Sequence, residues 1–476
     1  MKANTIYQFF GTTEQIKIVQ SLKEIVLNRD KLRNMCDYFT NCEPNLTQDY
    51  FMEYFTENLA DRKNMSQDFT PQCISQLVSE IGGKAENIAD VCAGSGSLFV
   101  QARNKNKDAF FSCYELSETV LYFLLFNMAV RNVNGQVIQM DILSGKIHAC
   151  YKLTRTETYS DIEVVGNPMV VKNDLVVSNP PYSLKCKEYN AKYKDYPDPP
   201  NQFADYAFVY FGLSIMKETG KCVYVLPHGL LFRGNKEKDI RKRLIQQKLL
   251  NAVIGLPDKC FLITSIPVFL LVLENNSQNV LFIDAKKECK KQSKYNAITQ
   301  RNVERIHHAY IGRFDIDKFS NIATVQEIEE NDYNLNIPRY VDTYEHEPLP
   351  DIMKVVDELL NINKEIKETE STLYRMMLQL VSSDAQRDAE LKKIVETFGR
   401  IVNENGINNG CIQPGAIKER EDISRGSNNN MPCSRKQRGQ KQTNTAKTGT
   451  GSSGKLRGGN TEEWEQLDLF TLCGMP

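Results

Sequence analysis

The tetrapeptide Asn179-Pro-Pro-Tyr182 directly follows an apolar run, Asp174–Val177, that predicts a β-strand. Two prolines fix the backbone and remove two N–H donors, so neighbouring carbonyl groups are free to accept hydrogen bonds. The Asn179 amide and the Pro180 carbonyl can accept both protons of an amine on an aromatic ring and return electron density to its nitrogen. The Tyr182 ring offers a face for stacking a planar base. We therefore predict alkyl transfer to a planar amine or amide nitrogen, with Asn179, Pro180, Pro181 and Tyr182 as catalytic residues.

A glycine-containing segment, Asp90-Val-Cys-Ala-Gly-Ser-Gly-Ser97, lies between an earlier apolar run and a helical stretch. Gly94 and Gly96 allow a sharp turn and the close approach of a ligand. Such a turn occurs in many dinucleotide enzymes, so the acidic residues beyond it matter. Glu115 ends the next predicted strand, where a carboxylate can hold two ribose hydroxyls, and Asp141 ends the third, within reach of an adenine amine. The alternative for both is capping of the protein surface.

Short apolar runs alternate with helical segments from about residue 65 to residue 345. This alternation predicts an α/β fold with an open, mostly parallel sheet covered by helices on both faces. The carboxyl ends of the strands would then place the polar groups at one edge, where such sheets bind ligands. The runs expected to form strands are Ile88–Val91, Ala109–Glu115, Val137–Asp141, Asp174–Val177, Lys221–Leu226, Ala252–Leu256 and Val268–Leu273.

The segments that flank this region differ in character. Residues 1–64 have apolar residues at helical spacing, which predicts a helical N-terminal domain. In residues 346–400, a 3-4 spacing of apolar residues over 352–380 predicts a long, coiled-coil-like helix for subunit assembly, or one packed on its own domain. Residues 401–476 lose periodicity and predict a low-complexity basic tail, largely disordered, that is either a linker or attracts phosphate.

Composition narrows the class of protein. The chain has 476 residues with 59 basic and 60 acidic side chains, which excludes a uniformly basic nucleic-acid binder but not local basic patches. The longest apolar run, Ile266–Leu273, is far shorter than the roughly 20 residues that span a bilayer, and we expect no membrane contact. The 13 cysteines lack metal-site spacing, so no metal is predicted. We expect a cytoplasmic protein with reduced thiols.

The motifs resemble, in type and order, those of N6-adenine DNA methyltransferases. They are Gln67-Asp-Phe-Thr-Pro71, Asp90 to Leu98, Glu115, Asp141 and Asn179 to Tyr182. Downstream segments extend the resemblance to the modification (methylase) subunit of type I restriction-modification systems. They are Ala204–Phe208, Leu226–Gly234, Ile240–Leu244, Val253–Pro257, Ile266-Pro267 and Tyr333–Tyr340. The resemblance covers about residues 10 to 385.

The resemblance implies a Rossmann-like, S-adenosylmethionine-dependent methyltransferase domain at 65–345. It would transfer a methyl group to an adenine flipped out of double-stranded DNA. Because no stretch is large enough for a target-recognition domain, a specificity subunit would choose the site and bind the helix at 352–382, with a restriction subunit as a further candidate partner. By the same resemblance the cofactor-binding residues are Gln67, Asp68, Phe69, Thr70, Pro71, Gln72, Asp90, Gly94, Ser95, Gly96, Ser97, Glu115 and Asp141.

The sequence departs from the family pattern at two positions, and two other functions are alternatives. Val91 stands where the family has Pro and Ser97 where Gly is usual, which bears on cofactor affinity rather than on the fold. A protein glutamine methyltransferase also fits, since a Gln amide nitrogen is planar, although Asn334–Arg339 and the heptad helix speak against it. The other alternative is a catalytically silent scaffold that binds DNA or partner subunits. The basic run Arg233–Arg243 is either a solvated helix face or a phosphate-contact surface.

Overall fold

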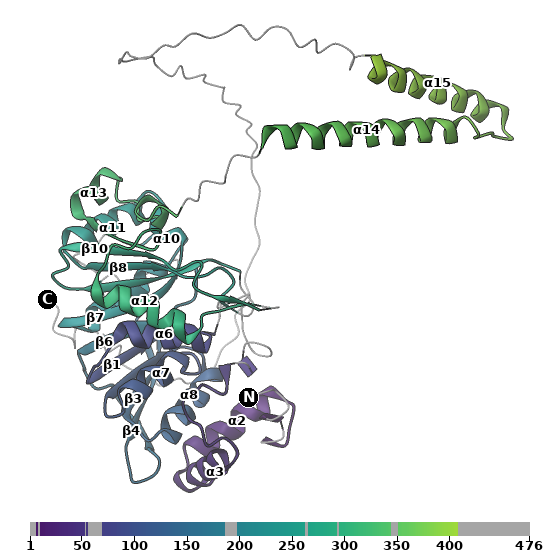
Figure 1. Ribbon diagram of the computed structural model, residues 1–476. Coiled ribbons are helices and arrows are strands. Elements are labelled where there is room, and N and C mark those ends of the chain that lie inside the picture. The colour runs from purple at the N-terminus through teal and green to yellow at the C-terminus, as the bar shows by residue number, and fades with distance from the viewer. Residues whose placement is uncertain are drawn as a thin grey trace, which may run out of the picture. The chain divides into compact units, whose positions relative to one another are not determined.

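Figure 1 shows the computed structural model of the chain. It describes residues 6–7, 10–52, 54–55, 69–185, 198–261, 265–292, 295–343 and 351–407. The chain divides into two compact units, one reaching Tyr344 and one beginning at Glu345. Among the described helices, none combines the length and apolar character needed to cross a membrane.

The first unit is built on an eleven-stranded sheet with the order β13-β10-β8-β9-β7-β6-β1-β2-β3-β4-β5. In chain order its strands are β1 (Asn87–Val91), β2 (Phe110–Glu115), β3 (Asn134–Asp141), β4 (Lys146–Thr154), β5 (Asp161–Val165), β6 (Asn173–Ser178), β7 (Met216–Pro227), β8 (Leu250–Gly255), β9 (Val268–Glu274), β10 (Asn279–Asp284) and β13 (Ser320–Thr324). A separate ribbon pairs β11 (Lys290–Lys291) with β12 (Asn296–Ala297).

The seven predicted strands are confirmed as β1, β2, β3, β6, β7, β8 and β9. The prediction of a mostly parallel sheet is right only for the centre, where β7, β6, β1, β2 and β3 are parallel neighbours. Of the outer pairs only β8 with β10 is parallel. The pairs β3–β4, β4–β5, β7–β9, β8–β9 and β10–β13 are antiparallel. The sheet is therefore mixed.

Helices cover both faces of the sheet, as expected (Figure 1). Successive side chains of a strand point to opposite faces, and Ile88 and Ala89 of β1 accordingly belong to two different hydrophobic clusters. The first cluster includes α6 (Gln72–Gly82), α7 (Ser97–Lys105), α8 (Glu118–Val130) and α12 (Gln300–Gly312). The second includes α9 (Asp205–Ile215), α10 (Gly229–Phe232), α11 (Lys236–Gln246) and α13 (Val325–Glu330).

Two helices near the N-terminus pack on the first cluster. They are α2 (Gln15–Val26) and α3 (Arg29–Cys42), and their buried faces include Ile18, Leu22 and Phe39. Phe39 meets Phe126 of α8 edge to face, with ring centroids 5.3 Å apart. These helices thus share a core with the sheet. The predicted domain boundary at residue 64 lies outside the described residues.

In residues 351–407, the described part of the second unit, there are two helices where the sequence predicted one. α14 (Ile352–Met377) is followed by α15 (Ala385–Ile407), which extends past the predicted start of the tail at 401. Gly399 of α15 lies against the Tyr374 ring of α14, where a Cβ would come within 2.8 Å of ring carbons. Within this unit the predicted seam stays exposed, with Leu359 at 54%, Ile366 at 47% and Leu373 at 47%. The rest of the tail lies outside the described residues.

Candidate active site

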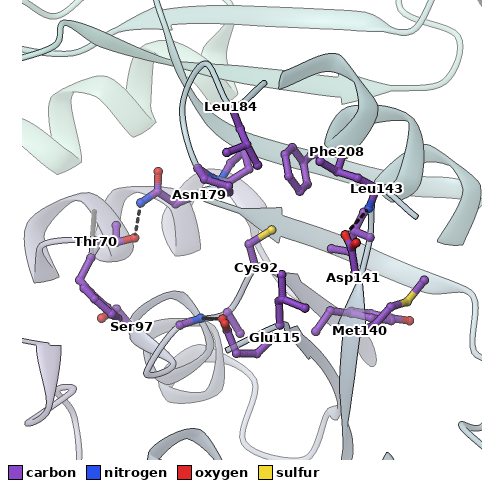
Figure 2. Close-up of a pocket in the computed structure, with 18 residues that line it drawn as sticks. Thr70, Cys92, Ser97, Glu115, Met140, Asp141, Leu143, Asn179, Leu184 and Phe208 are labelled. Carbon is purple, nitrogen blue, oxygen red and sulfur yellow. Dashed lines mark hydrogen bonds between the residues drawn. The ribbon is translucent and has the colours of Figure 1, made fainter. Parts of the chain in front are cut away.

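A pocket of about 260 Å³ opens at the carboxyl ends of β1, β2, β3 and β6. Figure 2 shows the side chains that surround it. The residues predicted for the site that line this pocket are Phe69, Thr70, Gly94, Ser97, Glu115, Asp141, Asn179, Pro180 and Pro181. The parallel centre of the sheet explains why they meet: Val91 of β1 is in register with Tyr114 of β2 and with Ser178 of β6, so the three strands end side by side.

The glycine loop after β1 turns through left-handed backbone at Cys92 (φ 62°), Gly94 (φ 57°) and Gly96 (φ 100°). A Cβ on Gly94 would lie 3.3 Å from the Phe69 ring, and one on Gly96 would lie 3.0 Å from the Leu124 side chain. Both glycines are therefore required by conformation and by space. Gly96 precedes the first residue of α7, so the loop brings the N-terminus of that helix to the pocket.

Glu115, at the end of β2, is fixed by the backbone around it. Its Oε2 accepts a hydrogen bond from the Gly94 N–H at 2.8 Å, and its Oε1 accepts one from the Ser117 N–H at 2.8 Å. Burial raises the pKa of this carboxyl. Each carboxylate oxygen can accept more than one hydrogen bond, so Glu115 holds the glycine loop in place and keeps acceptor capacity for a ligand.

Asp141, at the end of β3, also lines the pocket. Its Oδ1 accepts a hydrogen bond from the Leu143 N–H at 3.0 Å, and its Oδ2 accepts one from the Ser144 hydroxyl at 2.7 Å. These local contacts fix the carboxylate at the strand end. Apolar side chains, Leu116, Met140 and Phe208 among them, complete the wall around Asp141.

The Asn179 side chain is held from both ends. Its Nδ2 donates to Thr70 Oγ1 at 2.9 Å, and its Oδ1 accepts from the Tyr182 hydroxyl at 2.6 Å. Tyr182 itself is buried, is not among the described residues that line the pocket, and meets Phe261 edge to face at 6.2 Å. Its hydroxyl thus contacts Asn179, and the stacking face assigned to its ring stays a prediction.

Behind the tetrapeptide, Ser183 (φ 53°) donates its N–H to Oδ1 of the fully buried Asp205 at 2.9 Å. The Arg233 guanidinium lies 3.7 Å from Asp205 Oδ2 and 3.2 Å from Glu237 Oε1. Burial raises the pKa of both carboxyls, and Arg233 opposes that rise. Arg233, the first residue of the basic run, therefore stabilises the two buried carboxyl groups behind the tetrapeptide. Arg241 is buried and donates to the Tyr333 and Leu230 carbonyls. Both arginines, Arg233 although it is partly exposed, therefore make structural contacts within the protein.

Several described residues that were predicted to bind the cofactor do not line the pocket. Asp90 is buried, and its Oδ2 accepts from the Phe99 N–H at 2.9 Å, which ties β1 to α7. Burial raises the pKa of Asp90 well above its ordinary value, and its Oδ1 has no partner among the described residues. Pro71 precedes α6, whose first residue, Gln72, is exposed. Gln67 and Asp68 lie outside the described residues.

Sequence reasoning missed several residues of the site, of which Cys92 and Asp49 are polar residues next to the glycine loop. Cys92 lines the pocket, and Figure 2 shows its sulfur directed between Asn179 and Phe208. Its only sequence signal was its place inside the glycine loop. Asp49 contacts the other side of that loop: its Oδ2 accepts from the hydroxyls of Ser95 at 2.5 Å and Ser97 at 2.8 Å. A single Asp more than 40 residues upstream carries no sequence signal of this contact.

Comparisons with known proteins show what this chain is similar to. A family model described as N-6 DNA Methylase matches residues 47–348. The type I restriction enzyme MpnII methylase subunit of Mycoplasma pneumoniae is 28% identical over 75% of this chain and 68% of its own length. The MjaVIII methylase subunit of Methanocaldococcus jannaschii is 30% identical over 67% of this chain, and the match spans only 57% of that relative.

Solved structures are also similar to this chain, and one example follows. The crystal structure of the type I restriction-modification system methyltransferase subunit from Streptococcus thermophilus superposes with a TM-score of 0.54 at 29% sequence identity. The superposition covers 71% of this chain and 79% of that one.

Proposed function

The chain belongs to the N-6 DNA methylase family, and from this premise we propose that it is the methylase subunit of a type I restriction-modification system. It transfers a methyl group from S-adenosylmethionine to the exocyclic nitrogen of an adenine flipped out of double-stranded DNA. A partner specificity subunit chooses the site. The observation that carries the proposal is the meeting of Asn179, Pro180 and Pro181 with the glycine loop and Glu115 in one pocket.

The residues of the pocket fit S-adenosylmethionine. The carboxylates of Glu115 and Asp141 suit the ribose hydroxyls and the adenine amine, and their negative charge suits a sulfonium ion. The apolar wall that includes Met140 and Phe208 suits a flat base. Because Gly94 has no Cβ, a ligand can come close to the loop backbone beside Phe69. When bound, the cofactor supplies an electrophilic methyl group on a positively charged sulfur.

The chain's own part in the reaction is to orient the target amine. Thr70 and Tyr182 contact the two ends of the Asn179 amide. Because an amide oxygen has two lone pairs, we assign Asn179 Oδ1 to accept one proton of the target amine. The Pro180 carbonyl accepts the other proton of the amine. The two hydrogen bonds return electron density to the amine nitrogen as this nitrogen attacks the methyl group. Because the nitrogen becomes acidic only after it is methylated, no strong base is needed to remove the proton.

The decisive experiment is transfer of radiolabelled methyl groups to DNA, with and without a candidate specificity subunit as partner. Label in adenine N6 only when both subunits are present supports the proposal. Label in a protein glutamine would instead favour a protein glutamine methyltransferase. If the cofactor binds but nothing is labelled, the catalytically silent scaffold is favoured.

Glu115→Ala is expected to weaken cofactor binding at least tenfold, since each hydrogen bond to a charged group contributes about 1.5–3 kcal/mol. Because burial raises the pKa of Glu115, affinity in the wild type should be constant above that pKa and fall as the pH is lowered through it. Protonation of the carboxyl removes its negative charge and turns one of its two acceptor oxygens into a donor, so Glu115→Gln should bind weakly without that pH dependence. Calorimetry across a pH series tests this. An unchanged dissociation constant in Glu115→Ala contradicts the ribose contact.

A further inference from the structure

The two serines of the glycine loop are bound to a carboxylate from the N-terminal part of the chain. Asp49 Oδ2 accepts from the Ser95 hydroxyl at 2.5 Å and from the Ser97 hydroxyl at 2.8 Å. Asp49 Oδ1 accepts from Asn127 Nδ2 and from the Phe51 N–H, both at 3.0 Å. Hydrogen bonds to an ionised group are stronger than neutral ones, so one carboxylate joins the loop, α8 and its own segment.

The segment that carries Asp49 is itself anchored by Arg131, which is 1% exposed. The Arg131 guanidinium donates to the carbonyls of Leu46 at 3.0 Å and Gln48 at 2.6 Å. It also donates to the Asn127 side chain at 2.8 Å. Burial lowers the pKa of Arg131 to about 10, and the negative charge of Asp49 opposes that fall. The position of Asp49 is therefore fixed by a buried network rather than by a surface contact.

A second, apolar contact joins the same segment to the pocket. Phe55 stacks on Phe69, with ring centroids 5.2 Å apart and an interplanar angle of 22°. Phe69 lines the pocket and faces the position where a Gly94 Cβ would lie. Phe51 packs edge to face on Phe123 of α8 at 5.0 Å. Residues 46–52 and 54–55 thus contact Ser97 and Phe69 of the pocket wall, and Ser95 beside it.

We propose that Asp49 is a positioning residue for the glycine loop and that it couples docking of residues 46–52 to cofactor binding. The inference rests on the proposed function of the pocket as a cofactor site. Left-handed backbone at the non-glycine residue Cys92 is costly, and the Asp49 contacts hold the loop in this conformation. Without them the binding-competent loop is less populated, and affinity falls by the same factor. Because coupling is reciprocal, the cofactor in turn stabilises the docked segment.

A double-mutant cycle tests this coupling. Asp49→Ala is expected to weaken cofactor affinity by about tenfold, whereas in a Ser95→Ala/Ser97→Ala background the same change should cost less than about threefold. The rate at saturating cofactor should stay within about threefold of wild type, since the Asn179 site is untouched. Hydrogen exchange at residues 46–51 should slow when cofactor binds the wild type, and not when it binds Asp49→Ala.

Asp37→Ala is the matched control. Asp37 accepts a hydrogen bond from the Tyr159 hydroxyl at 2.9 Å, so it also joins the N-terminal helices to the sheet, but it does not contact the glycine loop. This variant should lower the melting temperature and leave cofactor affinity unchanged. Should Asp49→Ala fail to fold, Asp49→Asn keeps the volume and one acceptor oxygen and enters the same cycle.

Two results overturn the proposal: an Asp49 variant that binds cofactor as wild type does, or an effect that is equally large without the serine hydroxyls. These outcomes are distinct from failure of the proposed function. If wild-type protein binds S-adenosylmethionine but methylates no DNA, the assigned reaction is wrong while the cycle can still be measured. If wild-type protein does not bind S-adenosylmethionine, both ideas fail together.

Discussion

Asn179→Ala is expected to lower the rate of methyl transfer by roughly 10²–10³-fold, the loss typical when one preorganised polar group is removed from a reacting centre. The amide oxygen of Asn179 is the acceptor that directs the nitrogen lone pair toward the methyl group. Cofactor affinity should stay near that of wild type, because Glu115 and the Gly94 N–H hold each other without Asn179. Single-turnover methylation with the specificity subunit present, together with calorimetry, measures both quantities.

Two variants sharpen this prediction. Tyr182→Phe removes only the hydroxyl that donates to Asn179 Oδ1, so it should reduce the rate less than Asn179→Ala does. Asn275→Ala removes the same amide group at the end of β9, where it donates to the Glu218 carbonyl, and should change nothing. More than a few per cent of activity in Asn179→Ala, or an equal loss of cofactor affinity, would rule out the role assigned to Asn179.

Replacing Leu359, Ile366 and Leu373 with Asp should abolish assembly with the specificity subunit and, with it, site-specific methylation. These side chains form a stripe on α14 that is exposed within its own unit. Burying each Leu or Ile at an interface contributes roughly 1.5–3 kcal/mol, so three charges there are expected to prevent association. Cofactor binding should persist, because the pocket lies in the first unit. Size-exclusion chromatography of co-expressed subunits gives the readout, with calorimetry on the isolated variant.

The matched control is Lys364→Asp/Glu368→Asp/Ser371→Asp, which lies on the opposite side of α14 and changes the net charge by the same amount. It should assemble as wild type does. If the stripe variant still elutes with its partner, the assembly role of α14 is wrong. If the stripe variant loses cofactor binding or aggregates alone, the stripe belongs to the catalytic unit instead.

The sequence predicted the elements whose signal is local. Central strands such as β1 and β6 are buried on both faces and appear as continuous apolar runs. Edge strands β4 and β5 are half exposed, so their mixed composition did not distinguish them from loops, and the antiparallel edges of the sheet were missed. The α14–α15 hairpin was missed for a similar reason, since Val395 is the only buried apolar side chain among residues 385–402 of the second helix.

The residues of the candidate site likewise divide into those with a local sequence signal and those without one. Glu115, Asp141 and Asn179 could be found because each stands where a strand ends, and strand order then brings them to one pocket. Asp49 and Arg131 could not be found in this way. Leu46 and Arg131 are 85 positions apart, so no local pattern reveals that Arg131 contacts the segment that carries Asp49. Ser95 and Ser97 were noticed as loop residues, yet nothing in their spacing reveals that their hydroxyls point to Asp49.

The buried Arg131 also sets an order of events during synthesis of the chain. The carbonyls of Leu46 and Gln48 and their guanidinium partner are 85 and 83 residues apart. At about 5–20 residues per second, the ribosome needs roughly 4–17 s to add that length. Until α8 has emerged, Phe39 and Phe51 lack their partner rings on that helix, Phe126 and Phe123. The nascent N-terminal helices therefore expose apolar surface for several seconds before their native core is complete.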